Sequence, residues 1–234
     1  MEIIEKTQEK LKFSCKLNIS LANAIRRSVN KIPILAIEEC DIYKNDSALY
    51  DEVIAHRLGL IPLKNQKLKK GDTIELKLKS KGEEGGIEVM SGEFGDVSVY
   101  SDMPIVFLEK DQELEIVARA GVGNAKEHAK YSPGLIFYKH LAKIKISKEG
   151  ESHAELAELY PDVFLFENKL KVKDASKFDL DNDDLSEFPG VEVSFDDNLV
   201  FQIESWGQIS PREIFAESCN ALKSDLNALL KTIK

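Results

Sequence analysis

The chain has 234 residues, of which 43% are hydrophobic and 31% are charged, and this composition is typical of a soluble globular protein. The formal net charge of −9 predicts little direct nucleic-acid contact, because such affinity comes largely from Lys and Arg side chains that neutralise phosphates. No apolar stretch approaches the roughly 20 residues that a membrane-spanning helix needs, and no basic segment followed by an apolar run predicts a signal peptide.

The cysteines indicate a reducing compartment. Cys15, Cys40 and Cys219 are isolated from one another and odd in number, so they give no disulfide framework. None of the four histidines stands beside a cysteine at the spacing of a metal site. We therefore expect a cytoplasmic protein without a metal site built from these residues.

The first 45 residues predict a strand, a helix and a second strand. Residues 11–17 alternate between apolar and polar, as a strand does. Ser20 is placed to cap a helix that Pro33 ends, because proline offers no N–H and disfavours helical geometry in the preceding residue. Helical spacing places five residues on one face of this helix: Leu21, Ile25, Ser28, Val29 and Ile32. It puts on the opposite face Asn23, Arg26, Arg27 and Asn30.

A β-rich run over residues 34–43 and a turn at residues 45–47 lead to a second short helix. This helix is expected to begin near Asp51 and to end at Gly59, which suits a left-handed C-cap. His56 and Arg57 lie in its last turn, close to acidic residues of its first turn. Caps and surface ion pairs are the preferred account of this cluster.

Residues 47–147 are mainly β in character. The segment 73–79 alternates cleanly, with Ile74, Leu76 and Leu78 on one face. Further strands are expected at 87–90, 97–100, 105–108 and 114–118, and a long strand or strand pair at 135–146. The glycines at 82, 85 and 86 predict a hairpin turn, because they lack the order of a phosphate-binding loop and no helix follows them.

The segment 121–134 is a loop with a small basic and aromatic patch. The patch consists of Lys126, His128, Lys130 and Tyr131. Two interpretations stay open: a solvated loop with one packed aromatic ring, or a contact with another protein, since loops carry function more often than cores do.

Residues 151–198 differ in character from the β-rich region before them. We expect a short helical turn over 151–159 and a hairpin made by 163–166 and 170–172. No residue from 151 to 198 is a cysteine.

The acidic run 179–187 raises the question of a metal site. Asp179, Asp181 and Asp183 occupy the first, third and fifth positions of a possible calcium loop. The sixth position is Asp184 instead of Gly, and the twelfth is Gly190 instead of Glu, so the pattern fails at its two diagnostic positions. A solvated acidic loop is the preferred interpretation.

A strand at 199–205 and a long helix at 211–233 end the chain. Ser210, Pro211 and Glu213 are the N-cap, first residue and capping-box partner of this helix. An apolar seam with a period of 3.5 residues follows, formed by Phe215, Cys219, Leu222, Leu226, Leu229 and Ile233. A helix of this length extends roughly 34 Å. We therefore expect one part to cover the chain's own sheet and the other to meet a partner.

Three segments resemble a known family. Residues 21–27 read Leu-Ala-Asn-Ala-Ile-Arg-Arg, and residues 51–63 read Asp-Glu-Val-Ile-Ala-His-Arg-Leu-Gly-Leu-Ile-Pro-Leu. Residues 126–133 read Lys-Glu-His-Ala-Lys-Tyr-Ser-Pro, with Tyr131 where the family usually has Trp. These segments resemble the signature of the α-like subunits of cellular RNA polymerases. The resemblance is closest to the archaeal D-type subunits, the counterparts of bacterial α and of the eukaryotic third-largest subunit.

The resemblance implies an α+β fold with a discontinuous dimerisation domain. This domain would consist of residues 1–45 plus 199–234, with a β-rich domain inserted at 46–150. The resemblance also implies a small ferredoxin-like insertion at 151–198, where many archaeal relatives hold an iron–sulfur cluster. Because cluster iron needs thiolates, we expect a cysteine-free remnant with no cluster and no other cofactor.

The resemblance further implies a non-catalytic assembly platform of archaeal DNA-directed RNA polymerase. The chain would form a heterodimer with the small subunit L and then bind the large catalytic subunits and other small subunits. Nucleotidyl transfer would belong to the complex, and this chain would contribute no catalytic residue. Arg26 and Arg27 would face a large subunit, although a solvated helix face remains an alternative.

The residues expected to bind partners are Leu21, Ile25, Arg26, Arg27, Val29, His56, Arg57, Lys126, His128, Lys130, Tyr131, Phe215, Cys219, Leu222, Leu226, Leu229 and Ile233. Two other functions stay open. One is an adaptor or scaffold subunit of a different complex, and the other is a metal-dependent enzyme that uses the acidic run 179–187.

Overall fold

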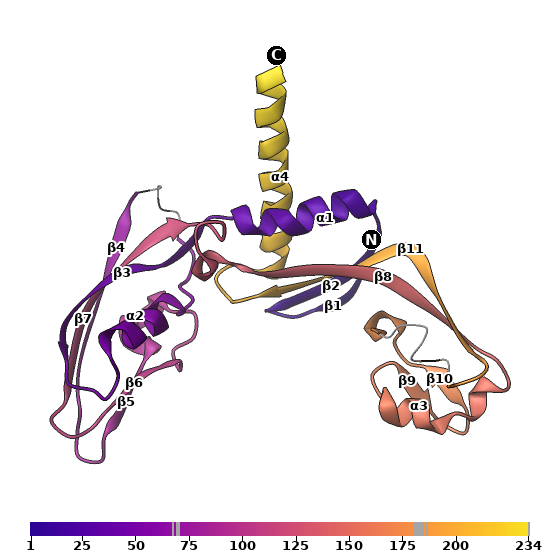
Figure 1. The fold of residues 1–234 in the computed structure, drawn as a ribbon, viewed down its shortest axis with the longest axis horizontal. Helices are drawn as coiled ribbons and strands as arrows, with labels where there is room; N and C mark the ends of the chain where they lie inside the picture. The colour runs from indigo at the N-terminus through magenta and orange to yellow at the C-terminus, as the bar shows by residue number, and fades with distance from the viewer. Residues whose placement is uncertain (67, 69–70, 180–184, 186, 234) are drawn as a thin grey trace. The chain divides into compact units, whose positions relative to one another are not determined.

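The structure is a computed structural model that describes residues 1–66, 68, 71–179, 185 and 187–233. It has a mixed α/β fold with mostly antiparallel sheets (Figure 1). The chain divides into two compact units. The first unit comprises Met1–Lys6, Leu11–Ala22 and Phe137–Gln202, and the second comprises Thr7–Lys10, Asn23–Ile136 and Ile203–Lys234. Within the described ranges, no helix is both long enough and apolar enough to cross a membrane.

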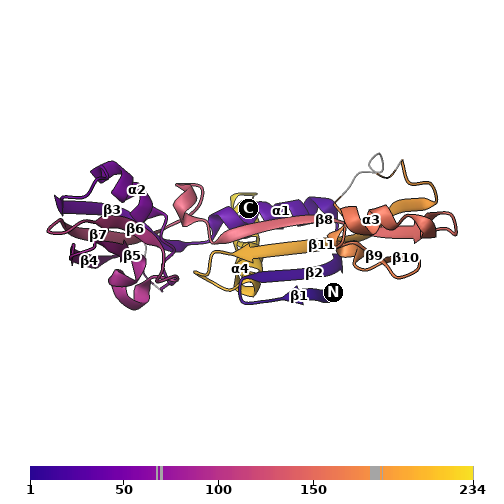
Figure 2. The same cartoon turned by 90° about the horizontal axis from the view of Figure 1, so that it is seen from below.

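A four-stranded sheet supplies the main strands of the first unit (Figure 2). Its spatial order is β1 (Glu2–Lys6), β2 (Lys10–Lys16), β11 (Val191–Ser205) and β8 (Gly134–Ile146). The rings of Phe13 and Phe201, both fully buried, stack with centroids 5.4 Å apart. Tyr138 lies against the same Phe201 ring at 5.5 Å. These aromatic contacts across strands hold the sheet together through apolar burial and ring packing.

The first unit also contains a small module between β8 and β11. Its regular elements are η4 (Gly150–Ser152), α3 (Ala154–Leu159), β9 (Phe164–Phe166), β10 (Leu170–Val172) and η5 (Ala175–Lys177). Leu156, Phe164 and Leu170 are buried in its core. The chain enters and leaves the module at one place, because the Ser147 N–H donates to the Gly190 carbonyl at 2.8 Å.

The second unit is built around a three-stranded antiparallel sheet. Its order is β3 (Ile34–Asn45), β7 (Glu113–Gly123) and β4 (Thr73–Lys81). Beside this sheet lie α2 (Asp51–Gly59), η2 (Ser91–Val97), and the paired strands β5 (Ile87–Met90) and β6 (Pro104–Leu108). One apolar core joins these elements, and its fully buried members include Leu35, Ile54, Leu58, Leu63, Leu108, Leu114 and Ile116.

Two helices carry most of the residues expected to bind partners. They are α1 (Ile19–Ser28), which continues into the 3-10 turn η1 (Val29–Lys31), and α4 (Pro211–Ile233). A further 3-10 turn, η3 (Ala129–Tyr131), lies in the predicted basic loop.

Most of the predicted elements are confirmed. The bounds of α4 agree with the expected helix 211–233, and α2 covers the predicted residues from Asp51 to Gly59. The hairpin of β9 and β10 forms as expected, with Asn168 at φ 67° in its turn. The long strand predicted over 135–146 is the single strand β8.

Four details of the prediction are wrong, and the first two concern helix ends. The cap of α1 is Asn18, whose Oδ1 accepts from the Ser20 N–H at 2.8 Å, because Asn18 offers an equally good cap two residues earlier. Gly59 does not adopt a left-handed conformation. Instead the chain tightens, with the N–H groups of Leu60 and Ile61 donating to the carbonyls of Arg57 and Leu58.

The other two errors concern strands. No strand forms over 97–100; this segment makes only a bridge to the segment around Leu63, and Pro62 lacks the N–H that would extend the pairing. The glycines at 82–86 do form a turn, but not a hairpin, because β4 pairs with β7 and β5 pairs with β6. One strand, β1, was not predicted, since its adjacent isoleucines show no alternation and its residues are all exposed.

Candidate partner-binding surfaces

The three cysteines are free and half-buried. Burial raises the pKa of the Cys15, Cys40 and Cys219 thiols above the ordinary value, so they stay protonated at neutral pH. Among the described residues, no group of three or more His, Cys, Asp or Glu side chains is placed to hold a metal ion.

The acidic run lies mostly outside the described residues, which omit 180–184 and 186. Asp179 is described, and its carboxylate forms an ion pair with the Lys139 ammonium. Lys139 also donates to the Phe178 carbonyl at 2.7 Å. The Asp179 carboxylate is therefore already paired with a cation from its own chain.

The first turn of α4 is fixed by a reciprocal capping box. The Glu213 N–H donates to Ser210 Oγ at 3.3 Å, and the Ser210 N–H donates to Glu213 Oε2 at 2.9 Å. Hydrogen bonds from Ser210 lower the pKa of the Glu213 carboxyl. Two of the helix's orphan N–H groups are thus satisfied by side chains, as the sequence predicts.

The two halves of α4 differ in burial. In its N-terminal half, Ile214 and Ser218 are fully buried, and the seam residues Phe215, Cys219 and Leu222 are half-buried. In its C-terminal half, Leu226, Leu229 and Ile233 are 53%, 56% and 73% exposed. Leu230, which the heptad pattern did not select, is 58% exposed beside them. The outer half of the helix therefore presents four large apolar side chains to solvent.

Contacts with η1 position α4. The Lys31 ammonium at the end of η1 forms an ion pair with the Asp225 carboxylate of α4. Lys31 and Asp225 are both partly solvated, so this pair contributes little stability. The pair nevertheless holds Asp225, at the start of the exposed half of α4, next to Lys31 at the end of η1.

The predicted face of α1 is only partly buried. Ile25 and Val29 are buried, whereas Leu21 is 44% exposed and Ile19, which was not predicted to matter, is 53% exposed. Ile25 and Val29 therefore cannot contact a partner directly, but they can hold the exposed residues of α1 in position. Ala22, the neighbour of Leu21 in the sequence, is fully buried.

The two arginines of α1 have different environments. Arg26 is half-buried, and its Nε and Nη2 both donate to Asn23 Oδ1, at 3.2 and 3.0 Å. Arg27 is exposed, and no hydrogen bond or ion pair joins it to another described residue. Arg26 is thus held by its own helix, while Arg27 keeps all five of its donors available.

The predicted residues of α2 also have different roles. His56 is exposed. Arg57 donates from Nη1 to the Ile105 carbonyl at 2.8 Å and so ties α2 to β6. Ile54 and Leu58 on the other side of the helix are fully buried.

The basic loop is held in shape by its own hydrogen bonds. The Lys130 N–H donates to His128 Nδ1 at 3.2 Å, and Asn124 Oδ1 accepts from the Lys126 N–H at 3.0 Å. Tyr131 is buried, and its ring covers Gly123, where a Cβ would lie 2.6 Å from the ring. Lys126 and His128 therefore project into solvent from an ordered backbone.

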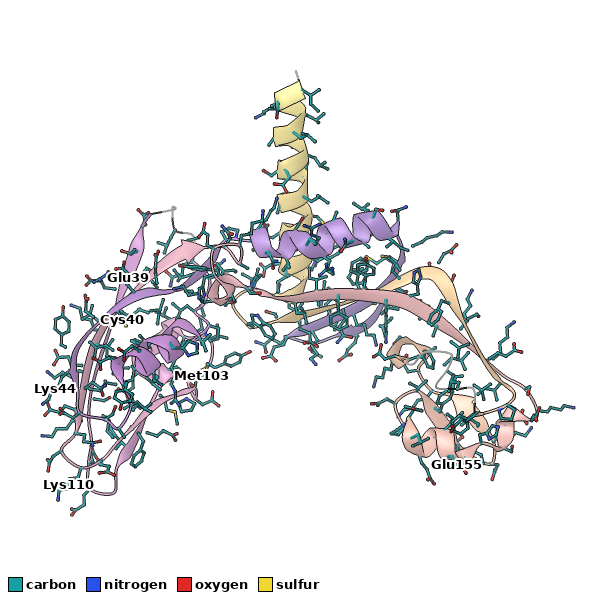
Figure 3. The ribbon with its side chains drawn as sticks, viewed as in Figure 1. Glu39, Cys40, Lys44, Met103, Lys110 and Glu155 are labelled. Carbon is teal, nitrogen blue, oxygen red and sulfur yellow. The ribbon has the colours of Figure 1, made fainter. Side chains whose placement is uncertain are left out.

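An ionic cluster on β3 and β7 serves the chain itself. Arg119 donates to Asp41 at 2.7 Å and to Glu39 at 3.1 Å, and these carboxylates raise the pKa of its guanidinium. Glu39, Cys40 and Lys44 follow one another along β3 in Figure 3. Since the pairs cross from strand to strand, the cluster strengthens the sheet and is not a free charged surface.

A comparison of the chain with models of protein families identifies its family. The model described as the RNA polymerase Rpb3/Rpb11 dimerisation domain matches residues 16–226, which is most of the chain. The chain belongs to this family.

Relatives of the family from archaea match most of the chain as well. The DNA-directed RNA polymerase subunit Rpo3 of Pyrococcus horikoshii is 35% identical over 92% of this chain and 90% of its own length. The Rpo3 subunit of Methanothermobacter thermautotrophicus is 31% identical over 94% and 93%, respectively. That of Thermococcus kodakarensis is 39% identical over 68% and 66%. Rpo3 is the archaeal D-type subunit that the three sequence segments resemble, so that resemblance is confirmed.

The range matched by the family model includes α1, α2, the basic loop and most of α4. It ends at Leu226, so the exposed residues Leu229, Leu230 and Ile233 lie beyond it. Sequence periodicity found two of these three. Leu230 falls outside the strict seam, and only its position next to Leu229 and Leu226 on the exposed half of the helix identifies it.

Proposed function

We propose that the chain is a non-catalytic assembly subunit of archaeal DNA-directed RNA polymerase, which pairs with the small subunit L before it binds the large subunits. The observation that carries the proposal is the exposed apolar half of α4. Four large apolar side chains, Leu226, Leu229, Leu230 and Ile233, gain stability when another surface covers them, at about 25 cal/mol per Å² of apolar area. A helix partner suits their spacing.

The polymerase as a whole is a nucleotidyltransferase, and this chain would supply its scaffold. Arg27 is the residue we assign to a large subunit, because its guanidinium is exposed and is not bound by another described residue. Its planar fork is suited to carboxylates or carbonyls on a protein partner. Lys126 and His128 would add a second basic contact from the ordered loop. The three free cysteines fit work in the cytoplasm.

The domain division belongs to the same proposal. We assign residues 1–45 plus 199–234 to dimerisation, 46–150 to the inserted β-rich domain, and 151–198 to the ferredoxin-like remnant. The separate core around Leu156 and Phe164 supports the last assignment. Packing in this core, and not an iron–sulfur cluster, would hold the remnant together.

Co-purification tests the main proposal. When the chain is co-expressed with an archaeal subunit L that alone carries an affinity tag, the two should elute together at equal stoichiometry. Adding a large subunit should then give a larger complex on gel filtration. A chain that elutes alone as a monomer in both steps would refute the assembly function.

Arg27→Ala tests the large-subunit contact. The variant should keep the heterodimer with subunit L and bind the large subunit more weakly, because one charge-assisted contact is lost. Arg212→Ala makes the same change at an exposed position of α4 and should leave both steps unchanged. If Arg27→Ala and Arg212→Ala recruit the large subunit equally well, Arg27 does not make the contact assigned to it.

Iron analysis tests the expectation about the remnant. Protein produced with ample iron and sulfide should be colourless and should contain no stoichiometric iron, because residues 151–198 provide no thiolate. Absorption in the visible range together with iron and sulfide at the ratio of a cluster would show that other residues ligate the metal.

A further inference from the structure

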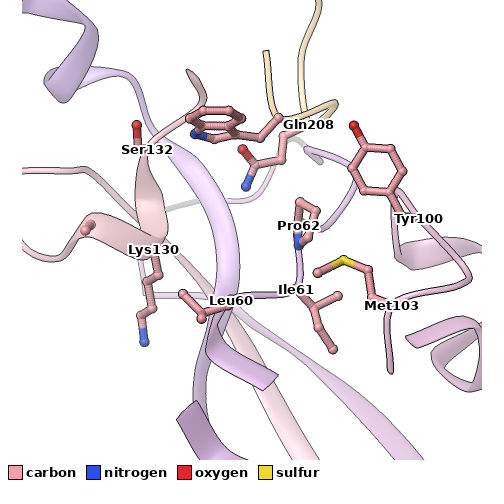
Figure 4. Close-up of a pocket in the computed structure, with 10 residues that line it drawn as sticks. Leu60, Ile61, Pro62, Tyr100, Met103, Lys130, Ser132 and Gln208 are labelled. Atoms are coloured by element: carbon pink, nitrogen blue, oxygen red, sulfur yellow. The ribbon is translucent and has the colours of Figure 1, made fainter. Parts of the chain in front are cut away.

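A pocket of about 330 Å³ lies in the second unit, beside the basic loop, and no residue of α4 lines it. Leu60, Pro62 and Met103 contribute to its mainly apolar lining (Figure 4). Trp206 also lines the pocket. Leu60 is 54% exposed and Trp206 is 44% exposed, so the rim is accessible from solvent. The volume is at the lower end of the range found for ligand sites, which is enough for one large side chain and too small for a folded element.

One polar group in this pocket lacks a partner. Gln208 is 8% exposed, and no described residue donates a hydrogen bond to its buried Oε1. Figure 4 shows the Gln208 amide facing the other lining residues, Pro62 and Leu60 among them. An unsatisfied buried acceptor is costly, so its presence in an accessible pocket indicates that something else supplies the donor.

The lining restricts what that donor can be. None of the described residues that line the pocket is acidic, so a cationic occupant such as Lys or Arg would find no carboxylate partner there. The one charged residue of this lining, Lys130, turns its ammonium to the Glu38 carbonyl at 3.4 Å. A water molecule alone would leave most of the apolar lining without contacts. A flat aromatic ring that carries an N–H or O–H satisfies both the apolar walls and the acceptor.

We propose that this pocket receives a tryptophan or tyrosine side chain from another polypeptide of the polymerase, and that the buried Gln208 amide turns toward it so that Oε1 accepts from its N–H or O–H. The inference rests on the proposed assembly function, since the donor comes from a partner subunit. It adds an anchor point that is separate from α4. Aromatic anchors seated in such pockets commonly carry a large share of the binding energy at protein interfaces.

Small aromatic probes test the chemistry of the pocket on the full chain. 5-Fluoroindole and 5-fluorobenzofuran have nearly the same shape, but only the indole donates a hydrogen bond. In ¹⁹F NMR titrations the indole should bind about tenfold more tightly than the benzofuran, because the benzofuran leaves the acceptor unpaired. Gln208→Met should abolish this preference, whereas Gln66→Met, the same change at an exposed position, should keep it. Equal binding of the two probes, or binding of neither, would overturn the proposal.

The assembled polymerase tests the source of the ligand. Trp206 is the one tryptophan of the sequence, so 5-hydroxytryptophan incorporated into this chain labels the pocket alone. Quenching of its fluorescence by acrylamide should fall several-fold when the chain assembles with unlabelled subunits. If the complex co-elutes but quenching does not fall, no side chain of a partner fills the pocket and the proposal is wrong. The pocket would then be a site for free small molecules. A chain that does not co-elute at all refutes the assembly function itself, and chromatography distinguishes that failure from the others.

Discussion

At the scale of single residues, Ser210 and Glu213 determine where the last helix begins. Each side chain accepts a hydrogen bond from the other residue's backbone N–H. Because the lowered pKa of Glu213 depends on these bonds, the cap also depends on pH. A carboxyl whose folded pKa is depressed contributes stability above its unfolded pKa, and this stability is lost as the pH falls through the folded pKa.

Ser210→Ala should destabilise the chain by about 1 kcal/mol at neutral pH, because one cap is lost. Chemical denaturation measured by circular dichroism checks this value. The difference between wild type and variant should shrink when the pH falls below the ordinary range of a glutamate. Ser224→Ala, an exposed serine in the same helix, is the control and should not destabilise. A difference between Ser210→Ala and wild type that does not change with pH would contradict the coupling to Glu213.

At the scale of elements, α4 combines two environments in one uninterrupted helix. Its N-terminal half packs inside the second unit through Ile214 and Ser218, and its C-terminal half exposes four large apolar side chains. Stability of the isolated chain and affinity for a partner therefore depend on different turns of the same helix. Substitutions in the outer turns can separate the two properties.

Leu226→Asp should leave the isolated chain as stable as wild type within about 0.5 kcal/mol, because the side chain is half exposed there. It should weaken the heterodimer at least about hundredfold, since assembly would bury an unpaired carboxylate. Calorimetric titration with subunit L measures the affinity, and thermal unfolding measures the stability. Asn227→Asp adds the same charge one residue further on and should have a much smaller effect. If Leu226→Asp binds subunit L with normal affinity, the apolar seam of α4 is not part of the interface and stays in solvent.

At the scale of the whole molecule, the chain leaves the sheet for the small module and returns to it at almost the same position, where Ser147 and Gly190 are hydrogen-bonded. The core of the module is closed on the sheet side by Ala142 and Val191, and Lys139 of β8 donates to the Phe178 carbonyl. The stacked rings of Phe13 and Phe201 are not members of this core. Removing the module should therefore expose the adjoining parts of β8 and β11 and leave the rest of the sheet in place.

Excision of residues 148–189, with a short Gly-Ser link in their place, should therefore preserve folding and binding to subunit L. Ser is also introduced at four positions of the adjoining strands whose side chains pack on the module and would otherwise be exposed, Ile144, Ile146, Val191 and Val193. The shortened chain should unfold cooperatively and bind subunit L with unchanged affinity. A chain that aggregates or loses subunit L would show that the module supports the sheet.

The sequence predicted best what local chemistry determines. The caps of α4, the alternation of β4 and the hairpin around Asn168 depend on neighbouring residues, and all three are confirmed. The sequence predicted less well what distant pairing determines. β11 begins at Val191, although the polar run around Asp196 and Asn198 disfavours a strand, because neighbouring strands override local preference. Gln208 was missed because an unsatisfied acceptor becomes visible only when its surroundings are known.

The uneven burial of α4 has a consequence for the lifetime of the newly made chain. A helix end without packing opens often, so the backbone from about Lys223 onward should exchange its amide hydrogens fastest and offer the first cleavage sites to a protease. Covering by a partner would remove those sites. The cell would then degrade surplus copies that found no partner and spare those already incorporated, which would balance the supply of this chain against that of its companions.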